Sequence, residues 1–203
     1  MSKAYEADGR TAQKQRTRRA LVEAARDVVA SGLTPTVEQA ATNAAISRTT
    51  AYRYFPNQRA LLMAAHPETA TASLLPDDPP SDPSARLDAV IDRFTQLILD
   101  TESQQRTMLR LSLEADEHER AALPLRQGRA IGWIEDALEP LKGSHTDEEL
   151  HRLSLAIRSA TGIEALAWMT DVARLPREEA ADLMRWSAGA LLRSALQHGM
   201  PRS

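Results

Sequence analysis

The chain of 203 residues contains no cysteine, which excludes disulfide bonds, thiolate zinc sites and thiol nucleophiles. Aromatic residues make up only 4% of it, while alanine and leucine dominate, a composition that favours helices over strands. No uninterrupted apolar run approaches the roughly 20 residues that span a bilayer, and the first residues are polar and charged. We therefore expect an all-α, cytoplasmic protein with no signal peptide and no membrane span.

Motifs of catalysis and of metal binding are also missing. The eight glycines form no G-x-x-x-x-G-K or G-x-G-x-x-G loop, and the five histidines show no tight spacing such as H-E-x-x-H. An acidic cluster at 114–119 is more typical of a solvated face than of a cation site. We expect no enzymatic activity, no metal and no cofactor.

The net charge of −3 hides an asymmetry between two parts of the chain. Residues 1–66 carry ten Lys or Arg and five Asp or Glu, a net charge of +5, whereas residues 67–203 carry fifteen and twenty-three, a net charge of −8. A basic first third on an acidic body indicates that the two parts meet different partners. The alternative is chance clustering on a solvated surface.

Glycine and proline divide the chain into segments. Residues 1–14 are polar and unpatterned, which predicts a flexible arm, and an apolar pattern of helical period then runs from Thr17 to Ser31-Gly32. Five of the eleven prolines fall within 66–84, which predicts a linker between a unit at 15–66 and an all-helical body at 67–203. Helical patterns in that body cover about 86–100, 103–119, 122–141, 146–173 and 176–198.

Two short helices joined by a tight turn are expected within the first unit. Thr36 is a suitable N-cap, with Gln39 completing a capping box, and Ser47 caps the next helix after a turn at Ala45-Ile46. Pro56 ends that second helix, and a connecting helix follows at 57–66. This is a helix-turn-helix pattern.

The second of these helices has two distinct faces. Ala51 and Phe55 face inward, whereas Arg48, Thr49, Tyr52 and Arg53 form one outward stripe. Such a stripe suits the DNA major groove, since Arg pairs with guanine and helix N-termini and hydroxyls hold phosphates. The alternative is a solvated amphipathic helix with aromatics packed at its edges. The candidate DNA-binding residues are Thr36, Ser47, Arg48, Thr49, Thr50, Tyr52, Arg53 and Tyr54, with Arg16 and Arg18 ahead of them.

The segment LVEAARDVVASGLTPTVEQAATNAAISRTTAYRYFPNQRALL, residues 21–62, resembles the TetR/AcrR family of transcriptional regulators. The matching positions are Thr36, Val37, Ala41, Ala44, Ile46, Ser47, Tyr52, Tyr54, Phe55, Leu61 and Leu62. The resemblance implies an N-terminal three-helix DNA-binding domain and a C-terminal helical bundle for ligand binding and dimerisation. It also implies a homodimer on a pseudo-palindromic double-stranded operator, released when a small-molecule effector binds.

Three departures from the family pattern change what is expected locally. Ala45 replaces the usual turn glycine, so the turn should be less left-handed or strained by about 1 kcal/mol. Gln58 stands where a lysine commonly meets a phosphate, so that contact should weaken. Ala40 and Ala51 are smaller than the usual residues, so the local core should be thinner and more closely packed.

The body offers candidates for the other two roles that the resemblance implies. The predicted dimer interface comprises Leu153, Ile157, Ala160, Leu183, Ala190 and Leu191, for which intramolecular core is the alternative. The predicted ligand pocket comprises Phe94, Ile98, Met108, Leu111, Trp133, Ala137 and Trp168, each of which is also compatible with simple core. Arg110 and Glu114, four residues apart, are spaced to pair on one helix face.

Two classes of function are therefore compatible with the sequence. The favoured one is a ligand-responsive regulator, a repressor that binds its operator as a dimer. The alternative is an all-helical small-molecule or protein-binding module without specific DNA binding. Specific duplex binding discriminates between them.

Overall fold

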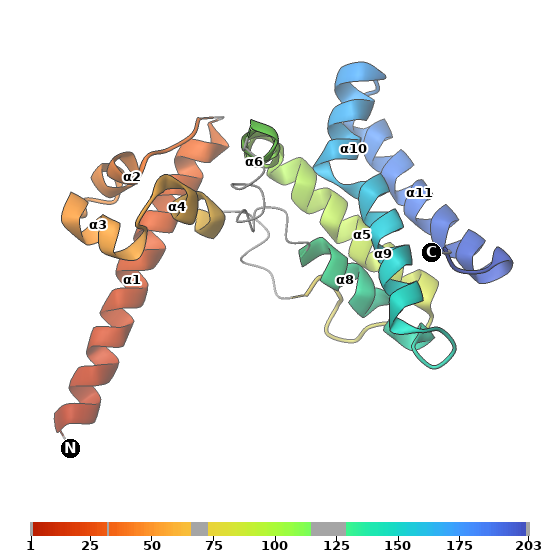
Figure 1. The fold of residues 1–203 in the computed structure, drawn as a ribbon, viewed down its shortest axis with the longest axis horizontal. Coiled ribbons are helices and arrows are strands. Elements are labelled where there is room, and N and C mark those ends of the chain that lie inside the picture. The colour runs from red at the N-terminus through yellow and green to blue at the C-terminus, as the bar shows by residue number, and fades with distance from the viewer. Residues whose placement is uncertain (1, 32, 66–72, 115–128, 202–203) are drawn as a thin grey trace.

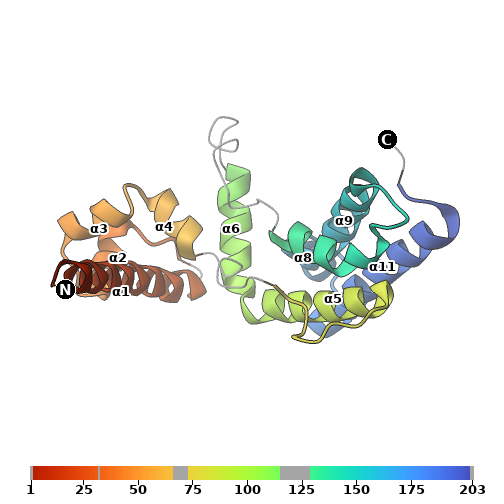
Figure 2. The ribbon, with the colours of Figure 1, turned by 90° about the horizontal axis from the view of Figure 1, so that it is seen from below.

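The computed structural model describes residues 2–31, 33–65, 73–114 and 129–201, with side chains from residue 11 onward except at Leu111. Every regular element in this part of the chain is a helix, which confirms the all-α prediction. A small N-terminal unit and a larger body lie side by side, and α6 stands between them (Figures 1 and 2). No helix among these residues combines the length and apolar character needed to cross a bilayer.

Four helices make up the N-terminal unit. They are α1 (Ser2–Ala30), α2 (Val37–Asn43), α3 (Arg48–Tyr54) and α4 (Gln58–Ala65). α1 packs against both α2 and α4, and α2 packs against α3. A buried cluster holds them together, formed by Leu21, Val22, Ala25, Val37, Ala40, Ala41, Ala51, Phe55, Leu61 and Ala65.

The N-terminal arm differs from its prediction. α1 begins at Ser2, so the segment predicted as a flexible arm is helical from that residue onward. It contains three alanines and two lysines, which have high intrinsic helix propensity, whereas Gly9 has low propensity. The prediction was wrong because it relied on an apolar stripe, which a helix that projects away from the core does not need (Figure 1).

The body contains α5 (Pro83–Asp100), α6 (Glu102–Glu114), α8 (Arg129–Leu138), α9 (Asp147–Thr161), α10 (Ile163–Ala167) and α11 (Arg177–His198). A 3₁₀ turn at Glu139–Leu141 and a π-helical segment at Trp168–Val172 complete it. α11 packs on α5 and α9, and α8 packs on the same two helices. Phe94 and Trp133 meet edge to face in this core, with ring centroids 5.9 Å apart. The predicted stretches within 115–128 lie outside the described residues.

The helix predicted at 146–173 is interrupted at Gly162. The backbone there is extended, with φ −89° and ψ 178°. The Arg158 side chain, which pairs with Glu164 at 3.1 Å, lies so close that a Cβ on residue 162 would sit 1.6 Å from Arg158 Nη1. A side chain at residue 162 would have to displace the flexible ends of Arg158 and Glu164, whereas the backbone there is not left-handed. Periodicity alone could not predict the break because the apolar pattern continues across it.

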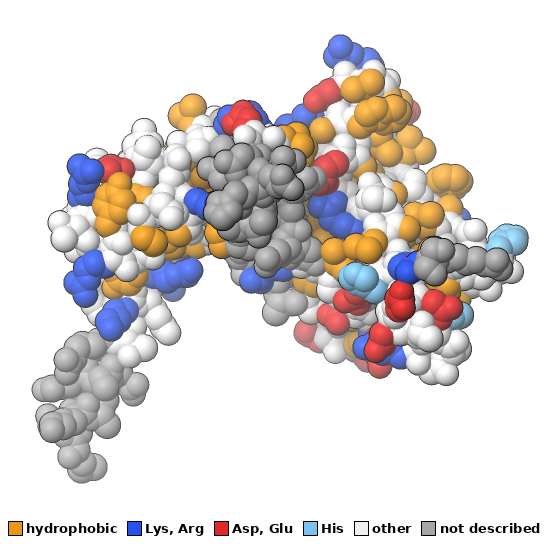
Figure 3. All heavy atoms as spheres, viewed as in Figure 1, with side chains coloured by type: hydrophobic (Ala, Val, Ile, Leu, Met, Phe, Trp, Pro, Cys, Tyr) orange, Lys and Arg blue, Asp and Glu red, His pale blue; other side chains and the backbone are white. Residues whose placement is uncertain are grey.

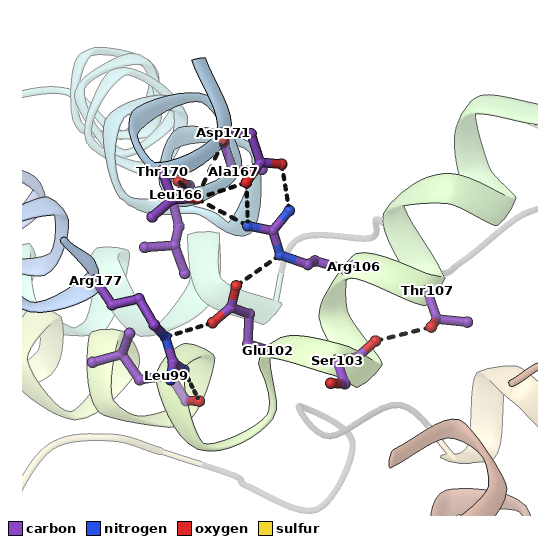
Figure 4. A network of polar contacts seen from close by, with 10 residues as sticks. All are labelled: Leu99, Glu102, Ser103, Arg106, Thr107, Leu166, Ala167, Thr170, Asp171 and Arg177. Carbon is purple, nitrogen blue, oxygen red and sulfur yellow. Dashed lines mark hydrogen bonds and ion pairs between the residues drawn. The ribbon is translucent and has the colours of Figure 1, made fainter. Parts of the chain in front are cut away.

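A network of charged groups fixes the start of α6 to the rest of the body (Figure 4). Arg106 donates two hydrogen bonds to the Asp171 carboxylate, at 2.7 and 3.0 Å, and a third to Glu102 at 2.7 Å. Glu102 also receives Arg177 from the first turn of α11, at 2.7 Å. The hydrogen bonds from Arg106 hold the pKa of Asp171 below its ordinary value, with a smaller contribution from Thr170.

The Arg106–Asp171 pair makes stability depend on pH. Because folding lowers the pKa of Asp171, its contribution to the free energy of unfolding is complete above the ordinary pKa of about 3.9 and disappears as pH falls through the lowered value. We expect Asp171→Asn to be destabilised at pH 7 and the difference from wild type to shrink below about pH 4. Urea unfolding over a pH series measures it, with Asp77→Asn as a surface control. A difference that stays constant with pH would contradict this assignment.

The two units are joined by apolar and polar contacts. Val29 of α1, Leu62 of α4 and Met108 of α6 form a small buried cluster. Arg110 pairs with Glu114 at 3.2 Å, as its spacing predicted, and also donates to the Thr34 hydroxyl at 3.0 Å across the joint. Met108, predicted to line a ligand pocket, therefore lies in the contact between the two units.

Candidate nucleic-acid interface

Side-chain caps set the start of both helices in the helix-turn-helix. The Thr36 hydroxyl accepts from Gln39 N at 3.1 Å, and the Gln39 side chain accepts from Thr36 N at 2.8 Å, which confirms the predicted capping box. Ser47 Oγ accepts from Thr50 N at 3.2 Å and donates to the Thr50 hydroxyl at 2.8 Å. These bonds use N–H groups that a helix start otherwise leaves unpaired, and they fix where α3 begins.

The turn between α2 and α3 retains the left-handed conformation despite the missing glycine. Ala45 has φ 54°, and its exposed side chain leaves the strain uncompensated by packing. The turn is closed by Ala45 N donating to Thr42 O and Ile46 N donating to Ala41 O, at 3.1 and 2.9 Å. Of the two outcomes predicted for this turn, the structure has the strained one.

Ala45→Gly is expected to stabilise the protein. Glycine removes the left-handed strain of about 1–2 kcal/mol but adds entropy to the unfolded chain, so the net gain should be about 0.5–1 kcal/mol. Thermal unfolding measures it. The matched control is Ala44→Gly, at φ −84°, which should destabilise. A destabilised Ala45→Gly variant would show that the turn is not strained.

The inward face of α3 packs as predicted. Ala51 and Phe55 are 0% and 2% exposed, and Ala51 lies in the same cluster as Ala40 of α2. The Arg18 guanidinium lies over the Phe55 ring at 5.4 Å from its centroid, a cation–π contact from α1. The small side chains of Ala40 and Ala51 are therefore both buried in this core.

The outward face presents the four predicted residues together. Arg48, Thr49, Tyr52 and Arg53 are all exposed, with the Arg48 guanidinium 5.7 Å from the centroid of the Tyr52 ring. Of the flanking candidates, Thr50 and Tyr54 are half-buried, and Tyr54 packs on the core cluster. Arg16, bonded to Gln13 at 2.8 Å, is an exposed residue of α1.

One residue at this surface was not predicted. Glu38 of α2 accepts from Tyr52 Oη at 2.6 Å and pairs with Arg48 Nη2 at 2.9 Å. The hydrogen bond from Tyr52 is the largest cause that holds the pKa of Glu38 below its ordinary value, so the group stays ionised near neutrality. The pairing joins two different helices, so no spacing along one helix could reveal it.

Glu38→Gln is expected to strengthen binding to any duplex about three- to fivefold. In a DNA complex the carboxylate would compete with DNA for Arg48 and repel phosphates, and an exposed pair of this kind is worth at most about 1 kcal/mol. Fluorescence anisotropy with random duplex measures it. Glu23→Gln on α1, whose carboxylate lies 3.7 Å from Arg19, is the matched control. Weaker binding by Glu38→Gln would mean that Glu38 positions Arg48 for DNA.

Gln58 is placed at the start of α4, beside this surface. Its Nε2 donates to Pro35 O at 3.0 Å, which ties α4 to the loop that precedes α2. Asn57 Oδ1 accepts from Ala60 N at 2.8 Å, confirming the predicted start of this helix. The Gln58 amide therefore makes an intramolecular bond at the position where the family resemblance led us to expect a weakened phosphate contact.

Most of the residues predicted to line a ligand pocket lie in the core of the body, and one lies on its surface. Phe94, Ile98, Trp133 and Ala137 are buried in the core of the body, and Trp168 is 60% exposed on the π-helical segment. The side chain of Leu111 lies outside the described residues. Two hollows are lined by other residues: one of about 340 Å³ beside the α5–α6 junction, and one of about 600 Å³ between α1, α4 and α8.

The residues predicted at the dimer interface differ in their exposure within this chain. Leu153 and Ile157 are 1% and 0% exposed within this chain, so they belong to its own core. Ala160, Ala190 and Leu191 are half-buried, and Leu183 is 42% exposed. Trp186 of α11 and Leu155 of α9, which the prediction did not include, are 66% and 43% exposed. Hydrophobic side chains gather over α10 and α11 on the face seen in Figure 3.

Comparisons with known proteins give a match in structure and none in sequence. No family model matches the chain, and no curated protein does. A TetR transcriptional regulator from Rhodococcus sp. RHA1 superposes with a TM-score of 0.61 at 21% identity, covering 89% of this chain and 98% of the other. A TetR-family transcriptional regulator from Streptomyces coelicolor gives 0.57 at 22% identity, covering 90% and 89%. The chain therefore has the fold of these regulators.

Proposed function

We propose that this protein is a TetR-type transcriptional regulator that binds double-stranded DNA through α3 and acts by binding and not by catalysis. One observation carries the proposal: four polar and cationic side chains stand together on a capped α3 whose other face is fully buried. The shared fold and the basic charge of the first 66 residues support it. A cytoplasmic location fits this function.

In the proposed complex, α3 enters the major groove. Arg48 lies in its first turn, where residues of a recognition helix reach base edges, and a guanidinium can donate two bonds to guanine. Thr49, Tyr52 and Arg53 complete the contact surface. The N-termini at Thr36 and Ser47, with Arg16 and Arg18 of α1, would hold phosphates and so position the helix without reading sequence. Thr50 and Tyr54, being half-buried, would support the surface from its edges.

Two copies of the chain are proposed to form the active species. Leu155, Leu183 and Trp186 give α9 and α11 an exposed apolar surface that a second copy would bury, with Ala160, Ala190 and Leu191 beside it. A two-fold dimer would place two α3 helices about 34–36 Å apart, one turn of DNA, on a pseudo-palindromic operator.

Release by a small molecule is proposed to act through α6. This helix contacts both units, through Met108 and Arg110 on one side and Arg106 on the other. A ligand that favours another position of α6 would change the spacing of the two α3 helices and oppose DNA binding, which makes the protein a repressor where the operator overlaps a promoter.

Selection from a random duplex library with the full chain tests the proposal. We expect enrichment of two half-sites related by a dyad, about 10 bp apart from centre to centre. Selection that enriches no motif would favour the alternative, an all-helical binding module without specific DNA recognition.

A further inference from the structure

The larger of the two hollows lies on the side of the N-terminal unit that faces the body. It is a groove of about 600 Å³, open to solvent, between α1, α4 and α8. In both ribbon views α4 lies between α3 and α8 (Figures 1 and 2). Among the described residues that line the groove, none comes from α2 or α3. It is therefore separate from the α3 residues proposed to read bases, although Arg18, a proposed phosphate contact, also lines it. Its volume is within the usual range of small-molecule sites.

Positive charge surrounds this groove. Arg18, Arg19 and Arg26 line it from α1, and Arg129 lines it from α8. The described lining residues include no Asp or Glu. Arg26 Nε donates to Ala65 O at 3.2 Å, which holds that side chain between α1 and α4. Arg19 also pairs with Glu23 at 3.7 Å, and Arg18 lies over the Phe55 ring. A guanidinium group matches the fork geometry of a carboxylate or phosphate.

The floor of the same groove is apolar. Val22 of α1 and Ala60, Met63 and Ala64 of α4 contribute to it. The two alanines leave space next to α4, and methionine adapts its shape to what it contacts. A bare inorganic anion would leave these apolar side chains exposed to water, whereas a molecule with a hydrocarbon body would cover them.

We propose that the groove binds an amphiphilic anion, with a carboxylate or phosphate head among the arginines and an aliphatic body on the α4 floor. Such a molecule would touch α1 and α4 of one unit and α8 of the other, so it would favour one arrangement of the two. Its effect on operator affinity rests on the proposed function, but its binding does not. A DNA phosphate supplies the charge but no hydrocarbon, so the floor favours a small molecule.

Titration of the full chain with octanoate, octyl phosphate and octanol tests the site in the absence of DNA. The probe is the ¹³C-methyl resonance of Met63, assigned among the six methionines with Met63→Leu. We expect saturable shifts with both anions and at least about tenfold weaker binding of octanol. Arg19→Gln and Arg129→Gln should each weaken octanoate binding about five- to tenfold. Arg152→Gln on α9, outside the groove, should bind like wild type.

Other outcomes would overturn the proposal. These are equal affinities for octanol and octanoate, wild-type affinity in both groove variants, or no saturable shift at millimolar octanoate. A Met63 shift caused by duplex DNA alone would assign the groove to phosphate contact instead. In a second assay, Arg129→Gln should bind the selected operator like wild type yet respond less to octanoate. If no operator can be selected, the octanoate titration still decides whether the groove is a site.

Discussion

Trp186→Glu is expected to convert the proposed dimer to a monomer and to lower operator affinity by about two orders of magnitude. Trp186 is 66% exposed on α11 and lies beside Leu183, also exposed, so its ring has little cover within the chain. In the proposed dimer it would be buried against the partner, where a carboxylate has no compensating group. A monomer contacts only one half-site of the operator, so the second half-site no longer contributes to the affinity.

Sedimentation and operator titration measure the two effects together. Leu113→Glu on α6, at a residue that is likewise 66% exposed, is the matched control and should remain dimeric. Circular dichroism should show both variants folded, since neither residue contributes to the core. A Trp186→Glu protein that sediments as a dimer would place the interface on another face.

Arg48→Ala is expected to cost about 1–3 kcal/mol of operator binding and to relax specificity at one base position. The side chain is 72% exposed and held only at the surface, by Glu38 and the Tyr52 ring, so its removal should leave α3 folded. The loss should therefore appear in DNA binding and not in thermal stability.

A lysine at the same position separates charge from geometry. Arg48→Lys keeps the attraction to phosphates but loses the bidentate fork, so it should bind random duplex like wild type and still lose specificity. If Arg48→Ala weakens binding to all sequences equally, with a reduced salt dependence, then Arg48 contacts a phosphate and another residue of the stripe reads the base.

Features fixed by local chemistry could be predicted from the sequence. The caps at Thr36, Ser47 and Asn57 bond to backbone groups three residues away, so the residue types alone indicate where α2, α3 and α4 begin. The two faces of α3 follow from helical geometry in the same way, because Ala51 and Phe55 fix which side is buried.

Features set by contacts between distant segments could not be predicted from the sequence. A stripe on a long helix shows that one side is apolar but not whether it meets its own chain or a partner. Leu153 and Ile157, predicted at the dimer interface, are buried within this chain, whereas Trp186 is exposed. Trp168 was a pocket candidate because its side chain is large and apolar, but it is 60% exposed on the π-helical segment. The pairing of Glu38 with Arg48 joins residues ten apart on separate helices and depends on how those helices pack.

Recognition of DNA sequence by α3 is tested most directly by one ratio. It is the affinity of the wild-type chain for its selected operator divided by that for a scrambled duplex of equal length, at about 150 mM salt, where non-specific attraction is screened. We expect a ratio of about 10³ or more. Equal affinities for the two duplexes would contradict it.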